Sequence, residues 1–329
     1  MLSRLNDNPM GGRDLSIGFD LGGTQVRAAL VDAGQVVKRA AARTDVAGGA
    51  EGVMGQFCAL ASEVCTQSQF ADVRAVGVSA PGPLDTETGI VDHIPTLPGW
   101  EEFPLRDRLA EIFERPATVE NDGIAAAFGE WKHGAGTGLD HLVYVTVSTG
   151  IGGGVVVDGR LMHGRRGMGA HVGHFRIAPE GPVCSCGAIG CFEAFAAGTA
   201  LGKRAKKAAS DNPSGYLGRL AAAGVVETRH AVEGARAGDA ECIALIEEEA
   251  DLLGVGFTGL AHLFSPQRII MGGGVSQAFD LLAAGIHRRI KRDAMAPFKN
   301  VEVVLAELGD NCGLVGAASL ALSVAKTDA

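Results

Sequence analysis

The feature that most constrains the fold is a pattern found once in each half of the chain: an apolar run followed by a glycine-rich turn. In the first half, the apolar runs Ser16–Asp20 and Val26–Val31 flank the turn Leu21–Gln25. In the second half, the apolar run His141–Ser148 leads into the turn Thr149–Gly154. A short apolar run bounded by glycine is typical of a buried strand, so each pattern predicts a β-hairpin. The recurrence indicates an internal duplication.

Strands and helices alternate along the rest of the chain. The apolar periodicity predicts helices at 51–69, 103–113, 122–131, 199–209, 215–223, 240–264, 277–293 and 313–325, and strands at 73–79, 117–120, 268–271 and 301–305. This alternation predicts an α/β fold. The 329 residues suffice for about two domains of roughly 100–200 residues each. We expect an N-terminal domain over 1–119, completed by a helix at 313–329, and a second domain over 120–312.

The charge and the terminal segment narrow the class of protein. The net charge of −9 disfavours nucleic-acid binding. The segment 1–13 lacks the apolar stretch of a signal peptide, and no run approaches the roughly 18 apolar residues of a membrane span. We therefore expect a cytoplasmic protein with no membrane or nucleic-acid partner. The basic cluster Lys203, Arg204, Lys206 and Lys207 is interpreted as the solvated face of a helix, with a phosphate-binding patch as the alternative.

Three glycine-rich tips, each directly after an apolar strand, together predict a polyphosphate site. They are Leu21–Gln25, Thr149–Gly154 and Gly272–Gly274. A turn without side chains lets backbone N–H groups approach an anion closely, although one such tip alone would only indicate a turn. Carboxylate and hydroxyl groups beside the tips suit hydrated Mg²⁺ and its phosphates. The candidate residues are Asp20, Gly22, Gly23, Thr24, Thr149, Gly150, Gly152, Gly273 and Gly274.

Other nucleotide-binding motifs fit poorly. Gly202-Lys203 is followed by Arg204, so the chain has no Walker A sequence there. A GxGxxG pattern at Gly254, Gly256 and Gly259 lies inside a helical stretch and does not follow a strand. This context is wrong for a dinucleotide-binding turn, so we interpret these glycines as sites of close helix packing.

A carboxylate suited to proton transfer lies where a strand ends and a helix begins, in Glu120-Asn121-Asp122-Gly123. Polar groups at the carboxyl edge of an α/β sheet often face a ligand. Asp122 is therefore a candidate base for a hydroxyl proton, with Asn121 orienting the substrate. The alternative is that Asp122 only caps its helix.

A cluster of soft ligands predicts a metal site. Cys184, Cys186 and Cys191 follow His174, and four such ligands suit a closed tetrahedral Zn²⁺ site. Because protein would fill all four positions, the metal would be structural and not catalytic. The alternative is three buried thiols and a core histidine. A disulfide between Cys184 and Cys186 is disfavoured by geometry and by a reducing compartment.

Taken together, these motifs resemble the ROK family of bacterial sugar kinases and repressors, over nearly the whole chain after about Leu15. The resemblance is carried by Asp20-Leu21-Gly22-Gly23-Thr24, Ser79-Ala80-Pro81-Gly82-Pro83-Leu84-Asp85, Glu120-Asn121-Asp122, Ser148-Thr149-Gly150-Ile151-Gly152-Gly153-Gly154, His171-Val172-Gly173-His174, Cys184-Ser185-Cys186-Gly187-Ala188-Ile189-Gly190-Cys191-Phe192-Glu193 and Met271-Gly272-Gly273-Gly274. It implies an actin-like (ribonuclease H-like) fold of two similar α/β domains.

The resemblance also implies a reaction and its residues. Asp122 would take the proton from the 6-hydroxyl of a hexose as that oxygen attacks the γ-phosphate of Mg-ATP, although polyphosphate stays open as the donor. The family is expected to form homodimers. The implied sugar contacts are Asn121, Asp122, His171, His174, Glu193 and the loop containing Gly82, and the implied zinc ligands are His174, Cys184, Cys186 and Cys191.

Two positions depart from the glucokinase-like pattern. His171 occupies a position where glucokinase-like members usually carry Glu, and Thr96 one where they usually carry Asn. Some bacterial N-acetylmannosamine kinases resemble this chain in having His at the first position. We expect glucose as the substrate, with an N-acetylhexosamine as the alternative. A sugar-sensing repressor is disfavoured because Asp20 leaves no room for a preceding DNA-binding domain, and a sugar-binding protein without turnover remains the third possibility.

Overall fold

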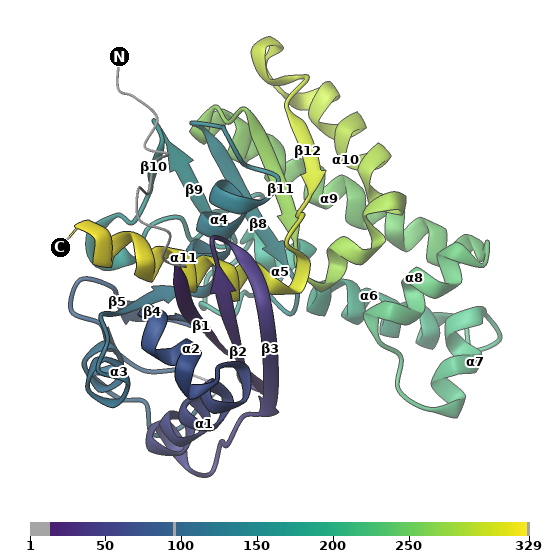
Figure 1. The fold of residues 1–329 in the computed structure, drawn as a ribbon. Coiled ribbons are helices and arrows are strands. Elements are labelled where there is room, and N and C mark those ends of the chain that lie inside the picture. Colours follow the sequence, from purple (N-terminus) through teal and green to yellow (C-terminus); the bar gives the residue numbers. More distant parts are fainter. Residues whose placement is uncertain (1–13, 95–96, 328–329) are drawn as a thin grey trace. The chain divides into compact units, whose positions relative to one another are not determined.

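The computed structural model describes residues 14–94 and 97–327. The chain folds into two compact units. The first unit comprises the chain up to Asn121 together with the chain from Gly313 onward, and the second is Asp122–Cys312. Figure 1 shows that each unit contains a sheet with helices packed on it. No helix in the described residues is long and apolar enough to cross a membrane.

The first unit contains a mixed five-stranded sheet of order β3-β2-β1-β4-β7. Its strands are β1 (Leu15–Leu21), β2 (Gln25–Asp32), β3 (Gln35–Arg43), β4 (Val73–Ala80) and β7 (Ala117–Asn121). The hairpin predicted at the first glycine turn is confirmed, because β1 pairs antiparallel with β2. Strand β3 was not predicted, since it is largely exposed and lacks a continuous apolar run. A short ribbon of β5 (Leu84–Asp85) and β6 (Ile90–Val91) follows β4.

The helices of the first unit are α1 (Gly49–Val64), α2 (Gln67–Asp72), α3 (Leu105–Phe113) and α11 (Cys312–Thr327). The single helix predicted at 51–69 is wrong, because Thr66 starts a new helix. The Thr66 side chain accepts a hydrogen bond from the Gln69 N–H, and the Gln69 side chain accepts one from the Thr66 N–H. This capping box satisfies helix-initiating N–H groups and favours a break there.

Glycines in the sheet let the C-terminal helix approach the backbone of the first unit. A Cβ on Gly18 of β1 would lie 2.0 Å from the Leu314 carbonyl oxygen, and one on Gly77 of β4 would lie 2.1 Å from that of Ala317. Because real Cβ atoms never come so close, only glycine permits this packing. Helix α11 is therefore part of the N-terminal unit, although it lies at the other end of the chain (Figure 1).

The second unit repeats the arrangement of the first, with sheet order β10-β9-β8-β11-β12. Its strands are β8 (Leu142–Val147), β9 (Ile151–Val157), β10 (Arg160–Leu161), β11 (Arg268–Gly272) and β12 (Glu302–Leu305). In both units the first strand pairs antiparallel with the second and parallel with the fourth. The shared topology agrees with the internal duplication inferred from the sequence.

The second glycine turn is shorter than predicted. Strand β9 begins at Ile151, so Gly152, Gly153 and Gly154 belong to the strand and not to the turn. The missing side chains of Gly154 on the strand and of Gly123 on the helix admit helix α4 (Asp122–His133). A Cβ on Gly154 would lie 2.5 Å from the Ala127 Cβ, and one on Gly123 would lie 2.5 Å from the Gly153 nitrogen. These glycines thus bring the helix that begins with Asp122 against the second hairpin.

Helices cover the sheet of the second unit. Besides α4, they are α5 (Phe192–Ala196), α6 (Gly198–Asp211), α7 (Tyr216–Ala223), α8 (Thr228–Arg236), α9 (Ala240–Phe264) and α10 (Phe279–Asp293). Helix α8 was not predicted. The helix predicted at 277–293 starts later, because Gly274–Ala278 forms a 3-10 turn. Apolar side chains of β8, β11, α6, α9 and α10 form the core of this unit.

The interpretation of the GxGxxG pattern as a packing motif is confirmed. All three glycines lie in α9, and each faces a different neighbour. A Cβ on Gly254 would lie 2.5 Å from the Arg289 Cβ of α10, one on Gly256 would lie 2.2 Å from the Phe192 ring, and one on Gly259 would lie 2.9 Å from the Phe175 ring. The pattern therefore serves helix contacts and has no role as a dinucleotide turn.

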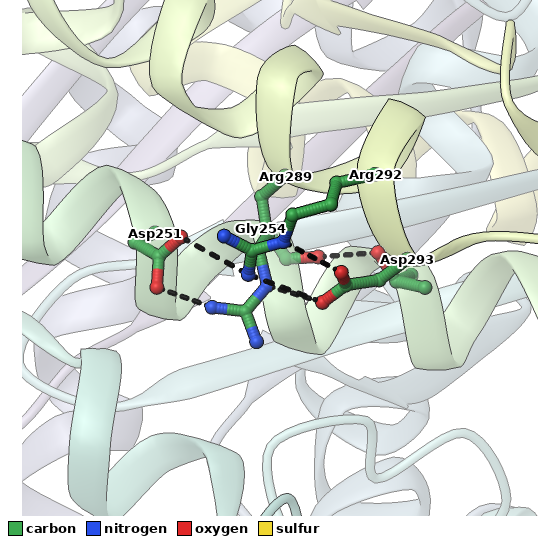
Figure 2. A network of polar contacts seen from close by, with 6 residues as sticks. Asp251, Gly254, Arg289, Arg292 and Asp293 are labelled. Carbon is green, nitrogen blue, oxygen red and sulfur yellow. Dashed lines mark hydrogen bonds and ion pairs between the residues drawn. The ribbon is translucent and has the colours of Figure 1, made fainter.

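A charged network closes the α9–α10 contact at the surface. Figure 2 shows Arg289 between the carboxylates of Asp251 and Asp293, with Arg292 also directed at Asp293. The Arg292 and Arg289 hydrogen bonds lower the pKa of Asp293 to about 2. Arg289 is only 20% exposed, whereas Arg292 is 61% exposed, so the Arg289 stem adds to the packing at Gly254 while the Arg292 ion pairs contribute little.

Candidate active site and metal centre

Asp20, the first predicted phosphate-site residue, is held by its neighbours in the sheet. The β1–β2 register places Asp20 opposite Arg27, and the β1–β4 register places it opposite Ser79. Arg27 donates to Asp20 Oδ2 from Nε at 2.9 Å, and Ser79 Oγ donates to Oδ1 at 2.9 Å. These contacts fix the carboxylate orientation. Arg27 and Ser79 were not assigned a role from sequence, although strand register could have paired them with Asp20.

The first glycine turn is closed by its own backbone and by β3. Gly22 N–H donates to the Gln25 carbonyl at 2.9 Å. Thr44, which follows β3, donates from Oγ1 to the Gly22 carbonyl at 2.7 Å and from its N–H to the Thr24 carbonyl at 3.1 Å. The Thr24 side chain is exposed, while Gly22 and Gly23 are half-buried. The turn is therefore ordered while Thr24 stays accessible.

Asn121 and Gly82 lie close together at the carboxyl edge of the first sheet. A Cβ on Gly82 would lie 3.5 Å from Asn121 Nδ2, and Asn121 ends β7, directly beside β4. The preceding Glu120 is buried, and its carboxylate accepts the Asn121 N–H at 2.8 Å. The structure thus brings together two of the residues predicted to contact substrate.

Asp122 is exposed at the first turn of α4. Its Oδ1 accepts the Gly123 N–H at 2.7 Å. A carboxylate at a helix N-terminus is favoured electrostatically, because unpaired N–H groups there carry partial positive charge. The contact between Gly123 and Gly153 ties this helix start to β9.

The second glycine turn lies beside the glycine tip that follows β11. A Cβ on Gly273 would lie 2.5 Å from the Val147 carbonyl oxygen, and Gly273 has a φ of +86°, which favours glycine. Helix α6 begins at the same place, where Gly198 N–H donates to the Ser148 carbonyl at 2.7 Å and Thr199 Oγ1 donates to the Thr149 carbonyl at 2.8 Å. Two of the three predicted tips and a helix N-terminus therefore converge within the second unit.

A cavity of about 590 Å³ opens at this convergence. Its volume is within the range of small-molecule sites, about 300–1,000 Å³. The turn residues Ser148, Thr149 and Gly274 contribute to its lining, α6 contributes Lys203 and Lys206, and apolar residues such as Val226 and Val275 also face it. The four residues of the basic cluster therefore have different surroundings. Lys203 and Lys206 line the cavity, whereas Lys207 pairs with Asp211 and Arg204 pairs with Glu249.

The predicted metal ligands lie together. Ligand atoms of His174, Cys184, Cys186 and Cys191 all lie within 4.8 Å of one another. Cys184 Sγ is 3.5 Å from His174 Nδ1, and Cys186 Sγ is 3.7 Å from Cys191 Sγ. A tight turn, in which Gly187 N–H donates to the Cys184 carbonyl, folds two of the cysteines toward the others.

The donor set fits a structural zinc ion. Three sulfurs and one imidazole are the ligands of closed Zn²⁺ sites, and all seven cysteines are free thiols. Burial, and then the neighbouring thiols, raise the pKa of Cys191 to about 12, whereas backbone hydrogen bonding lowers that of Cys186. Metal binding would replace the thiol protons of these ligands and so stabilise the folded segment that brings them together.

Glu193 lies between the predicted metal ligands and the second glycine turn. It lies in the first turn of α5, directly after Cys191 and Phe192. Its Oε1 accepts from Ser185 Oγ at 2.6 Å, and its Oε2 accepts from the Ile151 N–H at 3.0 Å. Ser185 was not singled out from the sequence, because nothing in its local pattern reveals a contact with Glu193.

His171 lies beside the predicted metal ligand His174. Burial, and then the charge of His174, lower its pKa, and the two rings have centroids 6.2 Å apart. A neutral imidazole donates one hydrogen bond and accepts one, whereas a carboxylate only accepts. Thr96, the second departure from the glucokinase-like pattern, lies outside the described residues.

Comparison with known proteins identifies the family. The sequence model of the ROK family matches residues 16–324. The chain belongs to the ROK family. The glucokinase of Thermotoga maritima is 36% identical over 307 residues, which cover 92% of this chain and 96% of the relative. The N-acetylmannosamine kinase of Pasteurella multocida is 30% identical over 306 residues, covering 92% and 94% of the two chains.

A solved ROK structure matches over nearly the full length. The crystal structure of a ROK family glucokinase from Streptomyces griseus, in complex with glucose and AMPPNP, has a TM-score of 0.79 at 36% identity and covers 93% of this chain and 98% of its own. The predicted α/β, actin-like fold of ROK kinases is thereby confirmed, with two mixed five-stranded sheets. This ROK protein is an ATP-dependent sugar kinase of the glucokinase-like group.

Proposed function

We propose that this ROK kinase phosphorylates the 6-hydroxyl of glucose, forming glucose 6-phosphate and ADP, with Asp122 as the general base. The observation that carries the proposal is the full-length likeness to glucokinases, one of which was crystallised with glucose and AMPPNP. Asp122 supports it locally, since its carboxylate is exposed at the helix start that packs on β9, the strand that follows the second glycine turn.

The nucleotide is assigned to the glycine turns and the cavity of the second unit. The adenosine would occupy the cavity beside Gly273 and Gly274, against its apolar lining. The phosphates would meet backbone N–H groups at Thr149 and Gly150. Gly152 is a weaker candidate than expected, because it lies within β9. From the first unit, Gly22, Gly23 and Thr24 would contact phosphate, and Asp20 would contact the hydrated Mg²⁺.

The sugar is assigned to the polar side chains that the family resemblance implies as sugar contacts. Asn121 and the backbone at Gly82 lie together in the first unit, and His174 and Glu193 lie beside the metal ligands in the second. Each offers the donors or acceptors that sugar hydroxyls require. His171 would contribute one donor and one acceptor in place of the usual carboxylate.

The proposed step balances in charge and atoms. The sugar O6 loses its proton to the Asp122 carboxylate and forms a bond to the γ-phosphorus, while the bond from that phosphorus to the bridging oxygen breaks and ADP leaves. Phosphoryl transfer passes through a loose transition state, so positioning and charge neutralisation supply most of the acceleration. A general base typically contributes about 10²–10⁴-fold.

Zinc would be held by His174, Cys184, Cys186 and Cys191. With four protein ligands it would fix the segment 174–191 and supply no reactive water. The homodimer implied by the family resemblance, and a cytoplasmic location, stay predictions.

Sugar-dependent ADP release by the zinc-loaded protein with Mg-ATP tests the proposal. The sugars are glucose, mannose, fructose, N-acetylglucosamine and N-acetylmannosamine. We expect turnover on glucose, and we expect Asp122→Asn to lower kcat by about 10²–10⁴-fold while AMPPNP still binds, because the amide cannot take the proton. Wild-type levels of turnover in Asp122→Asn would exclude this base, and no turnover on any sugar would contradict the kinase reaction.

An N-acetylmannosamine kinase is the alternative. It is favoured by His171 and by the likeness to the Pasteurella multocida enzyme. The substitution His171→Glu restores the usual glucokinase-like residue and separates the two. If glucose is the substrate, this variant should keep its preference for glucose. The alternative would be supported if the wild type turned over only N-acetylmannosamine and if His171→Glu reduced this preference.

A further inference from the structure

One carboxylate group connects the metal-binding segment to the second glycine turn. Both oxygens of Glu193 accept hydrogen bonds: Oε1 accepts from Ser185 Oγ at 2.6 Å and from the Cys184 thiol at 3.5 Å, and Oε2 accepts from the Ile151 N–H at 3.0 Å. Ser185 lies between the metal ligands Cys184 and Cys186. Ile151 directly follows Gly150 of the turn.

The Glu193 carboxylate packs directly against Gly150 of the turn. A Cβ on Gly150 would lie 2.5 Å from Glu193 Oε2, so any side chain there would displace the carboxylate. The Glu193 N–H donates to the Gly173 carbonyl at 2.8 Å, and a Cβ on Gly173 would lie 2.0 Å from the Ile151 carbonyl oxygen. Backbone packing on both sides therefore holds the Glu193–Ile151 contact in place.

We propose that Glu193 is a positioning residue for the second glycine turn and that, through Ser185, it couples metal binding to nucleotide binding. A bound metal fixes the two cysteines on either side of Ser185, and hence fixes the hydroxyl that orients the carboxylate. A correctly oriented carboxylate holds the Ile151 N–H and thereby the turn. The inference rests on the proposed role of Thr149 and Gly150 in holding the nucleotide phosphates.

Coupling of this kind is reciprocal. If the metal strengthens nucleotide binding by some factor, the nucleotide must strengthen metal binding by the same factor. We expect a factor of about fivefold or more, at the lower end of typical couplings between two sites.

The experiment measures the affinity for Mg-AMPPNP by calorimetry, without sugar, on zinc-loaded and zinc-depleted protein. Besides the wild type it uses Ser185→Ala and Glu193→Gln, with Ser210→Ala, an exposed serine on α6, as the matched control. A chelator competition, with and without Mg-AMPPNP, measures the zinc affinity of each protein. Metal analysis and circular dichroism establish that each variant is folded and loads zinc.

In the wild type and in Ser210→Ala, zinc depletion should weaken Mg-AMPPNP binding by about fivefold or more, and Mg-AMPPNP should tighten zinc binding equally. In Ser185→Ala and Glu193→Gln, zinc depletion should change the Mg-AMPPNP affinity much less, and Mg-AMPPNP should change the zinc affinity much less. An Mg-AMPPNP affinity in the wild type that is independent of zinc, or full coupling in Ser185→Ala, would overturn the inference while leaving sugar-dependent turnover intact. A wild type that neither binds Mg-AMPPNP nor turns over would overturn the proposed function as well.

Discussion

Carboxylate side chains at the candidate site of this kinase are oriented by hydrogen bonds from other segments of the chain. Asp20 is oriented by Arg27 and Ser79 from neighbouring strands, and Glu193 is shared between Ser185 and Ile151. By contrast, the two lysines that line the cavity, Lys203 and Lys206, form no ion pair within the described residues.

Replacing both lysines should therefore weaken nucleotide binding. We expect Lys203→Gln with Lys206→Gln to raise the KM for ATP by about threefold to tenfold, with little change in kcat, because each solvated charge contributes up to about 1 kcal/mol. The dependence of this KM on KCl should also become flatter, since salt screens exposed charges. Steady-state kinetics at two KCl concentrations measures both effects.

The matched control is Lys207→Gln. Lys207 is on the same helix and pairs with Asp211 at 2.5 Å, but it does not line the cavity. An equal rise in the KM for ATP in this control would show that the effect is one of overall charge and not of the cavity.

Helices in the second unit pack through residues that have no side chain. Gly254 of α9 faces Arg289 of α10 (Figure 2). Gly285 of α10 faces Ala250 of α9, so each helix supplies a glycine to the other. The same device brings α4 onto β9 at Gly153 and Gly154. Close backbone approach therefore positions these elements.

Gly254→Ala should consequently destabilise the protein despite the higher helix propensity of alanine. Its Cβ would lie 2.5 Å from the Arg289 Cβ, so the helices must separate. We expect the free energy of unfolding to fall by about 1–3 kcal/mol, as for other overpacked sites. Gly55→Ala is the control, because a Cβ in that helix meets nothing within 4 Å, and it should raise stability by roughly 0.5–1 kcal/mol. Urea unfolding measures both, and a stabilising Gly254→Ala would contradict the packing argument.

The stability of the whole molecule depends on pH through a buried acid in the second core. Glu249 of α9 is fully buried, its Oε2 contacts Arg204, and its Oε1 has no hydrogen-bond partner among the described residues. Burial raises the pKa of Glu249 to about 8, and Arg204 opposes the rise. The folded state therefore binds the proton more tightly than the unfolded state does. Stability should fall as pH rises from about 4.5 to about 8, by at most about 1.4 kcal/mol per pH unit.

The substitution Glu249→Gln isolates this contribution, because glutamine cannot ionise. Relative to the wild type, the Tm of Glu249→Gln should rise between pH 5 and pH 8, whereas that of the exposed control Glu247→Gln should follow the wild type. Scanning calorimetry at several pH values measures the difference. A Tm difference that is constant between pH 5 and pH 8 would contradict the raised pKa of Glu249.

Local patterns in the sequence were enough to predict most strands, the glycine hairpins, the family and the grouping of His174, Cys184, Cys186 and Cys191. Apolar periodicity and ligand spacing involve neighbouring residues, so they can be read from the chain directly. Strand register and packing between distant segments decided the rest: the contacts of Asp20 with Arg27 and Ser79, the placement of Gly152 within a strand, and the sharing of Glu193 between Ser185 and Ile151. The Asp20–Arg27 contact follows from the register of one hairpin, whereas the contacts of Asp20 with Ser79 and of Glu193 with Ser185 and Ile151 depend on which segments the folded core brings together.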